Sequence, residues 1–353
     1  MISIGVDAHK QVHVALALDE GGRELGRWQG PNSQGGWSDL LQWAVNLGSP
    51  RQWGIEGAWN YGRGLAQHLV VSGETVSEVN ARWTAQGRRT ARRPGKSDAL
   101  DARAVALLVW REAATLPQVA ADDETAVLDL LTTEREAALA EATRLRNQIH
   151  QLLLQLDPEY RVHLPNLQTK AGLAAVAGYQ AASTRALDQE RAAAVRRLAQ
   201  RLQLALDQVV DLTTQIEARA ATGFSPLTQL CGINLLTAGA LAGILGPGRR
   251  FQTDAQLAAY AGAAPLEASS AGQSRHRLNR GGNRRLNAIL YRIALTQARH
   301  DPAARTYLAR RVSEGKSKRE AIRSLKRFLI RAIFRLWQQC LPIQAALPAG
   351  RAA

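Results

Sequence analysis

Four carboxylates in the first third of the chain have the residue types and spacing of a metal site. Asp7 follows an apolar stretch within GVDAHK, and Glu56 ends a second apolar stretch within GIEG. Asp98 and Asp101 lie three residues apart, so on a helix their side chains share one face. Such a pair alone could serve only the electrostatics of a helix N-terminus. A carboxylate buried directly after an apolar strand, however, is costly without a partner such as a metal ion. The four acids together therefore predict a site for Mg²⁺ of the kind used in phosphoryl transfer.

Strands and helices in alternation must position these acids. Apolar residues recur at every second position over 12–18, and with strands ending at Asp7 and covering 24–28 they predict an antiparallel meander. We expect helices near 37–45, 65–71 and 98–110, the last capped by Ser97, and strands at 52–55 and 75–79. A sheet that opens with a hairpin and continues with strand-helix crossovers is the order expected of an α/β domain of the RNase H-like class.

Cationic side chains indicate a polyanionic partner, most simply nucleic acid. The net charge is +15, and residues 249–335 alone hold 20 Lys or Arg against 5 Asp or Glu. A second run lies between Asn80 and Ser97 and contains no carboxylate. From this run we expect nucleic acid to be bound by Arg88, Arg89, Arg92, Arg93 and Lys96.

Two long helices are predicted in the middle of the chain. Apolar residues alternate three and four apart from Leu128 to Leu156 and again from Val195 to Ile216, as in a coiled coil. Asp157-Pro158 ends the first helix, and an irregular connection of about thirty residues should follow. The same spacing is satisfied by pairing within one chain and by pairing of two chains. The second possibility predicts a homodimer that assembles into a tetramer.

A resemblance to a known family rests on the ordered motifs GVDAHK, GIEG and KSDALDA, together with AAYAGAAPLEASSAGQSRHRLNRGGNRRLN at residues 258–287. This set resembles the DEDD-and-serine transposases of bacterial insertion sequences, the bridge-RNA-guided DNA recombinases. The resemblance implies a RuvC-like catalytic domain over 1–115, a helical stalk over 116–222, a mostly helical basic domain over 223–340 and a flexible tail over 341–353. It also implies that Asp7, Glu56, Asp98 and Asp101 hold Mg²⁺, and that a bridge RNA pairs with donor and target DNA.

The same resemblance places a serine nucleophile in EASSAG. Ser270 takes the nucleophile's place, but Ala271 stands where the family has glycine, so Ser269 is the alternative. Several nearby arginines could clamp the attacked phosphate, namely Arg275, Arg277, Arg280, Arg284 and Arg285. The residues alone would indicate only a small polar loop before a helix.

The predicted function is thus a Mg²⁺-dependent transposase that exchanges DNA strands. The alternatives are a Holliday-junction resolvase or nuclease in which water attacks, and a noncatalytic nucleic-acid-binding protein. No apolar run is long enough to span a membrane, and Met1 leads directly into a strand-like segment rather than a signal peptide. Cys231 and Cys340 fit no metal-ligand spacing and are expected to be reduced core thiols. The expected location is the cytoplasm, on the nucleoid.

Overall fold

The computed structural model describes residues 1–80, 83–84, 97–247, 250–264, 266–267, 276–277 and 282–346. The chain divides into two compact units, which are considered separately. The N-terminal unit comprises residues 1–123 and 247–252, and the C-terminal unit comprises 124–246 and the chain from 253 onward. The predicted four-part division of the chain stays a prediction.

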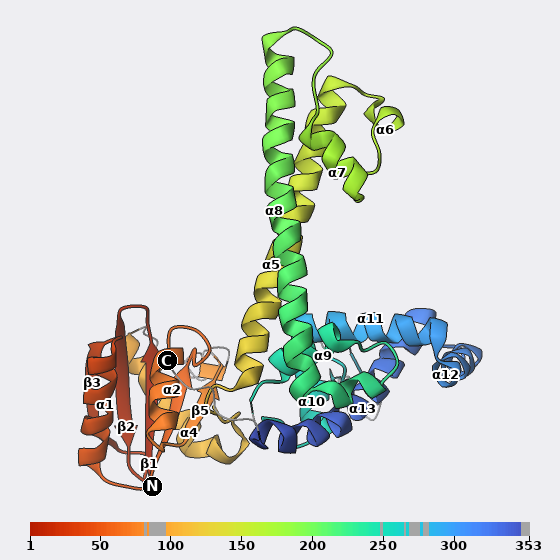
Figure 1. Ribbon diagram of the computed structural model, residues 1–353. Coiled ribbons are helices and arrows are strands. Elements are labelled where there is room, and N and C mark those ends of the chain that lie inside the picture. The colour runs from red at the N-terminus through yellow and green to blue at the C-terminus, as the bar shows by residue number, and fades with distance from the viewer. Residues whose placement is uncertain are drawn as a thin grey trace. The chain divides into compact units, whose positions relative to one another are not determined.

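A five-stranded sheet forms the centre of the N-terminal unit (Figure 1). Its strands, in the order β3-β2-β1-β4-β5, are β1 (Ile2–Ala8), β2 (Val12–Leu18), β3 (Glu24–Pro31), β4 (Arg51–Glu56) and β5 (Val76–Val79). The first three are antiparallel, whereas β4 runs parallel to β1, and β5 runs parallel to β4. The predicted meander and the two later strands are therefore confirmed, as is the mixed α/β class of this unit.

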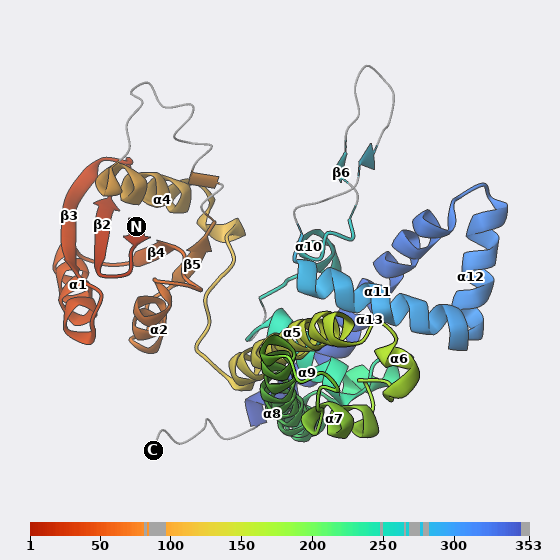
Figure 2. The same ribbon diagram turned by 90° about the horizontal axis from the view of Figure 1, so that it is seen from above.

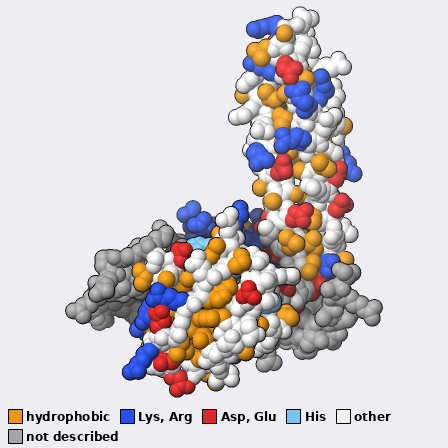
Figure 3. Space-filling view, turned by 90° about the vertical axis from the view of Figure 1, so that its left-hand side faces the viewer, with side chains coloured by type: hydrophobic (Ala, Val, Ile, Leu, Met, Phe, Trp, Pro, Cys, Tyr) orange, Lys and Arg blue, Asp and Glu red, His pale blue; other side chains and the backbone are white. Residues whose placement is uncertain are grey.

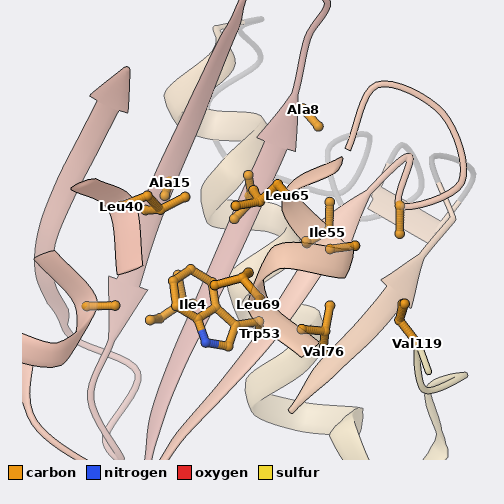
Figure 4. Packing of buried hydrophobic residues seen from close by; sticks show 14 of the residues in the cluster. Ile4, Ala8, Ala15, Leu40, Trp53, Ile55, Leu65, Leu69, Val76 and Val119 are labelled. Carbon is orange, nitrogen blue, oxygen red and sulfur yellow. The ribbon is translucent and has the colours of Figure 1, made fainter. Parts of the chain in front are cut away.

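Helices cover both faces of this sheet (Figure 2). On one face lie α1 (Gln34–Leu47) and α2 (Arg63–Val71), and on the other lies α4 (Asp98–Glu112). Figure 4 shows the apolar core between the sheet and the helices α1 and α2, in which Ile4, Trp53 and Ile55 of the strands pack with Leu40 of α1 and Leu65 of α2. Alternate residues of each strand face opposite sides of a sheet, so the polar residues of β1 that face α4 are separated from this apolar core.

The position of α4 depends on glycine in β1. A Cβ at Gly5 would lie 2.1 Å from the backbone nitrogen of Ala106 and 2.3 Å from the carbonyl oxygen of Ala102. The backbone of α4 therefore lies directly against β1, which only glycine allows. The Ser97 side chain accepts a hydrogen bond from the Leu100 N–H, which confirms the predicted cap and fixes where α4 begins.

The C-terminal unit contains the two predicted long helices, α5 (Glu124–Leu156) and α8 (Ala186–Gly223), which lie side by side within one chain (Figure 1). Residues at the expected spacing, such as Leu145, Ile149 and Leu202, form their shared core. The connection was expected to be irregular, and this expectation is wrong. It contains α6 (Tyr160–His163) and α7 (Lys170–Ala177), because Leu173 and Val176 are buried against the long helices and the Thr169 hydroxyl caps α7.

The rest of the C-terminal unit is mostly helical. Its elements are η2 (Ser225–Gln229), α9 (Leu235–Leu245), α10 (Asp254–Tyr260), a two-stranded pair β6 (Leu266–Glu267) and β7 (His276–Arg277), α11 (Arg284–His300), α12 (Pro302–Ser313) and α13 (Lys318–Ala346). Cys340 is buried as expected, and burial raises the pKa of its thiol to about 11. Cys231, by contrast, is exposed, so its assignment to the core is wrong. Over the described residues, no helix has the length and apolarity needed to cross a membrane.

Candidate functional site

Two of the four predicted acids meet at one edge of the sheet. Asp7 of β1 and Glu56 of β4 are register partners on neighbouring parallel strands. Both lie at the carboxyl ends of their strands, which is where open α/β sheets commonly bind ligands. The parallel pairing of β1 with β4 thus brings together residues that are 49 positions apart in the sequence.

The first turn of α4 brings the other two acids to the same edge. Asp101 is buried, with 6% of its surface exposed, and Asp98 is exposed. The pKa of Asp7 is raised, mainly by burial, and further by the charges of Asp101, Glu56 and Asp98. The charges of three neighbouring carboxylates therefore act on the carboxylate of Asp7, which is itself only 6% exposed. All four predicted acids thus lie in one neighbourhood, and the ligand oxygens of Asp7 and Asp98 lie within 4.8 Å of each other.

His9 also belongs to this cluster. Its Nε2 lies 3.1 Å from Oδ2 of Asp7 and 3.6 Å from Oδ1 of Asp98. The ligand atoms of these three residues all lie within 4.8 Å of one another, close enough to share one cation. The positive charge of a protonated His9 would oppose the rise in the pKa of Asp7. The sequence analysis missed His9, although its place two residues after Asp7 at a strand end was a usable signal.

Glu56 is held by a further residue that the sequence analysis missed. The Thr84 hydroxyl donates a hydrogen bond of 2.8 Å to Oε2 of Glu56, and Thr84 is almost fully buried. This contact orients one carboxylate oxygen and leaves the other available as a ligand. Thr84 lies in a segment without periodic pattern, so nothing in the sequence pointed to it.

The oxygen-rich donor set fits a hard divalent cation. Carboxylate oxygens are the ligands that Mg²⁺ and Mn²⁺ take in proteins, and clustered carboxylates repel one another unless a cation neutralises them. In this structure the pKa of Asp7 is raised by burial first, and the charges of the neighbouring carboxylates raise it further. Bound there, a divalent cation could activate an attacking oxygen and stabilise charge on a phosphate.

A second group of polar contacts fixes the two ends of the segment that contains the serine motif. Nδ2 of Asn283 donates to the Tyr260 hydroxyl at 2.8 Å, and Nδ2 of Asn287 donates to the carbonyl of Ala261 at 2.7 Å. Nζ of Lys326 donates to Oδ1 of Asn287 at 2.7 Å, and burial lowers the pKa of this lysine. The segment between 264 and 282 thus starts and ends at one polar cluster. Ser269 and Ser270 themselves lie outside the described residues.

The predicted nucleic-acid-binding arginines and Lys96 can be placed only in part. Outside the described residues lie Arg88, Arg89, Arg92, Arg93, Lys96, Arg275 and Arg280, and of Arg277 only its place in β7 is described. Arg284 is exposed at the start of α11. Arg285 instead forms ion pairs with Asp129 at 2.8 Å and Glu136 at 3.0 Å, both on α5. Its guanidinium is therefore already engaged in holding α11 against α5.

The chain resembles known proteins of bacterial insertion elements. Residues 4–158 match a transposase family of the DEDD type named for IS110, and residues 225–309 match the family described as "Transposase IS116/IS110/IS902 family". The chain is 33% identical to an uncharacterized 43.6 kDa protein of insertion element IS110 from Streptomyces coelicolor, over 72% of this chain and 74% of the relative. It is 26% identical to a 42 kDa protein of IS900 from Mycobacterium paratuberculosis, over 92% of both chains.

The match of residues 4–158, together with the 33% identical relative, places the chain in the class of DEDD-type transposases, and acids at the carboxyl ends of β1 and β4 are in keeping with that class. Within that class, the chain belongs to the IS116/IS110/IS902 family. A transposase moves segments of DNA, so DNA is its substrate, and a DEDD-type domain points to a divalent metal ion.

Proposed function

We propose that this protein transposes its insertion element by Mg²⁺-dependent DNA strand exchange, with a RuvC-like, RNase H-like N-terminal domain and a serine nucleophile. The observation that supports this most directly is the convergence of Asp7, Glu56, Asp98 and Asp101 at the carboxyl edge of β1 and β4. A binding protein gains nothing from four mutually repelling acids at one point. An enzyme that needs Mg²⁺ gains a site from them.

Burial and hydrogen bonding distinguish the residues of the acidic site in this proposal. Asp7, with Asp101 of α4, would supply the buried ligands, and Thr84 would keep Glu56 oriented as a further ligand. The bound Mg²⁺ supplies charge stabilisation at the phosphate. Gly5 lets the backbone of α4 lie directly against β1, and this close packing sets the distance between Asp7 of β1 and Asp101 of α4.

Ser270 supplies the nucleophile, with Ser269 as the alternative. Its Oγ forms a bond to phosphorus while the P–O bond to one DNA strand breaks, and the proton of the hydroxyl passes to the released strand oxygen. Attack by the hydroxyl of a second strand reverses the step, regenerates the serine and joins the new DNA ends. Because the phosphodiester bond is conserved as a protein–DNA ester, no nucleotide triphosphate is needed.

A bridge RNA and an assembly of four chains complete the proposal. As the resemblance implies, base pairing with this RNA would choose donor and target DNA. A homodimer that assembles into a tetramer could bring the serine of one chain to the acidic site of another. The charge of the C-terminal unit suits both DNA and RNA.

Covalent trapping tests the proposal. Purified protein is incubated with element-end DNA, the element's noncoding transcript and Mg²⁺, and adducts that survive denaturant are digested for mass spectrometry. We expect a nucleotide on Ser270, which Ser270→Ala abolishes and Ser269→Ala retains. Strand cleavage without an adduct would show that water attacks, as in a nuclease. Binding without cleavage, in wild type and in Asp7→Asn alike, would leave only a nucleic-acid-binding protein.

A further inference from the structure

The helices α12 and α13 form a hairpin (Figure 2). Two aromatic side chains, one from each helix, meet on its surface. The rings of Tyr307 on α12 and Phe328 on α13 have centroids 5.1 Å apart and contact each other edge to face. Phe328 is 50% exposed, although a ring needed only to join two helices could be buried between them. A half-exposed phenylalanine beside a tyrosine is a surface that a planar ligand can cover.

An arginine lies over each of these rings. The guanidinium carbon of Arg310 is 5.5 Å from the centroid of Tyr307, and that of Arg331 is 5.8 Å from the centroid of Phe328. Their side chains are 65% and 55% exposed. Each also lies near one acid, Arg310 at 3.6 Å from Glu314 and Arg331 at 3.4 Å from Asp254. Such exposed pairs are weak and easily exchanged for a phosphate.

The charge around the rings selects the class of ligand. Residues 302–335 contain eleven Lys or Arg and two Asp or Glu, so the hairpin carries most of the net charge of the chain. Such an excess suits a polyanion and opposes a partner protein of similar charge. A duplex offers this surface only phosphates, because its bases are stacked inside the helix. Unpaired bases, in contrast, stack on exposed aromatic rings while arginines hold the adjoining phosphates.

We infer that Tyr307, Phe328, Arg310 and Arg331 form a binding surface for single-stranded nucleic acid, with a base stacked against Phe328. We call these four residues the α12–α13 aromatic surface. The inference deepens the proposed function by naming the form of nucleic acid that this unit holds. It rests on that function only in taking a nucleic acid as the partner, and it requires neither metal nor cleavage. Unpaired DNA and unpaired RNA offer the same chemistry here.

Binding measurements without divalent ions test this inference apart from strand exchange. The full chain is titrated, by fluorescence anisotropy, into labelled single-stranded DNA, the RNA of the same sequence and the matching duplex DNA. We expect Phe328→Ala to weaken single-strand binding roughly 5- to 100-fold, the range for loss of one base stack. Duplex binding should change little. Phe328→Trp should restore single-strand binding, because indole stacks at least as well as phenyl.

Controls separate stacking from charge and from folding. Tyr291→Ala removes an aromatic side chain of matching exposure, 49%, from α11 of the same unit and should leave binding unchanged. Arg331→Gln should weaken duplex and single-strand binding alike and lower the salt dependence. A larger loss on DNA than on RNA, or the reverse, identifies which strand uses the surface. Equal loss of duplex and single-strand binding in Phe328→Ala, or a failure of Phe328→Trp to restore it in a folded protein, would overturn the inference. So would a changed oligomeric state in Phe328→Ala with unchanged affinity.

Discussion

Asp7 is the acid whose ionisation is disfavoured by its surroundings in the acidic site. Its pKa is raised by burial first and then by three neighbouring carboxylates. A raised pKa means that the folded state holds the proton more tightly than the unfolded state does. The free energy of unfolding therefore falls as pH rises from the ordinary Asp value toward the raised one, and the loss persists at neutral pH. Binding of a divalent cation should return this stability.

Asp7→Asn should therefore separate stability from metal binding. Without divalent ions at neutral pH, we expect the melting temperature of the variant to exceed that of wild type, by about 2–4 °C if burial of the charge and the repulsion together cost about 1 kcal/mol. Calorimetry should find no difference at pH values below the ordinary pKa of Asp, where the carboxyl is protonated in both states. Added Mg²⁺ should stabilise wild type only. A variant that is less stable than wild type without metal, yet equally stabilised by Mg²⁺, would place Asp7 outside the site.

His9 should set the metal preference of the site. An imidazole nitrogen favours Mn²⁺ and later transition ions over Mg²⁺, which prefers oxygen. His9→Gln should weaken Mn²⁺ binding roughly tenfold or more while changing Mg²⁺ binding less, as calorimetric titration of each ion would measure. His68→Gln is the control, because His68 belongs to α2, which covers the face of the sheet away from α4. If His9 merely neutralises Asp7 and Asp98 as a cation, its removal would tighten the binding of both ions.

Much of the acidic site could be predicted from the sequence, for reasons that differ from residue to residue. Asp7 and Glu56 follow apolar strands, and Asp98 lies three residues before Asp101 on a capped helix. Each of these signals is local. Thr84 reaches Glu56 only through tertiary structure, from a segment with no periodic pattern, so its role could not be predicted.

The contact between β1 and α4 is the element-scale feature on which the acidic site depends. Gly5 permits it, and its register partner Gly54 faces Val105 and Val109 of the same helix. A side chain at Gly5 would meet backbone atoms of Ala102 and Ala106, which cannot move unless the whole helix moves. Displacing α4 also displaces Asp98 and Asp101 from Asp7.

Gly5→Ala should therefore damage stability and metal binding together. We expect a loss of about 1–3 kcal/mol in the free energy of unfolding, from urea denaturation, and weaker binding of Mg²⁺. Gly35→Ala is the control, because a Cβ there meets nothing within 4 Å and alanine favours the helix α1. It should raise stability by about 0.5–1 kcal/mol. Normal metal affinity in a folded Gly5→Ala protein would contradict this account of how α4 is placed.

Helix prediction succeeded where the apolar period was long enough to recognise, and capping or breaking residues then marked some of the helix ends. Ser97 and Asp157-Pro158 marked the start of α4 and the end of α5 correctly. The short helices α6 and α7 span too few residues to show a period, and their burial against α5 and α8 decides their structure. The two long helices were predicted, but their apolar spacing suits pairing within one chain and pairing of two chains equally. In the structure α5 pairs with α8 of the same chain, and Leu145 and Leu202 share one core.

At the scale of the whole molecule, the charge count overstates the cations available to nucleic acid. Arg285 pairs with Asp129 and Glu136, and Arg327 pairs with Asp254. Lys326 is buried and bound to Asn287. These cations hold α11 and α13 in place. The excess of Lys and Arg counted in the sequence therefore includes side chains used in folding contacts as well as side chains exposed for binding. On α5 and α8, charges of both signs are instead interspersed with hydrophobic side chains (Figure 3).

Assembly through the long helices must use residues that the pairing of α5 with α8 leaves accessible. Leu145 and Ile149 are fully buried in that pairing, so substitutions there would unfold the helices rather than test association. Leu152 and Leu198 are only partly buried, and they line a shallow groove on the helix pair together with Gln148, Gln151, Gln155, Ala194, Arg197 and Arg201. An apolar centre with a polar and cationic rim has the composition of a protein interface.

The double variant Leu152→Glu with Leu198→Glu should therefore convert a dimer into monomers. Burying two carboxylates at the centre of an interface should raise the dissociation constant roughly thirtyfold or more, measured by light scattering over a concentration series. Circular dichroism should show unchanged helix content, since both positions lie at the margin of the α5–α8 core. Val210→Glu, at a position of α8 that is 62% exposed and faces away from the groove by helical periodicity, should leave association unchanged.

Strand exchange should be lost in the double variant while nucleic-acid affinity per chain persists. A wild-type protein that stays monomeric both free and bound to DNA and RNA would exclude assembly through this groove.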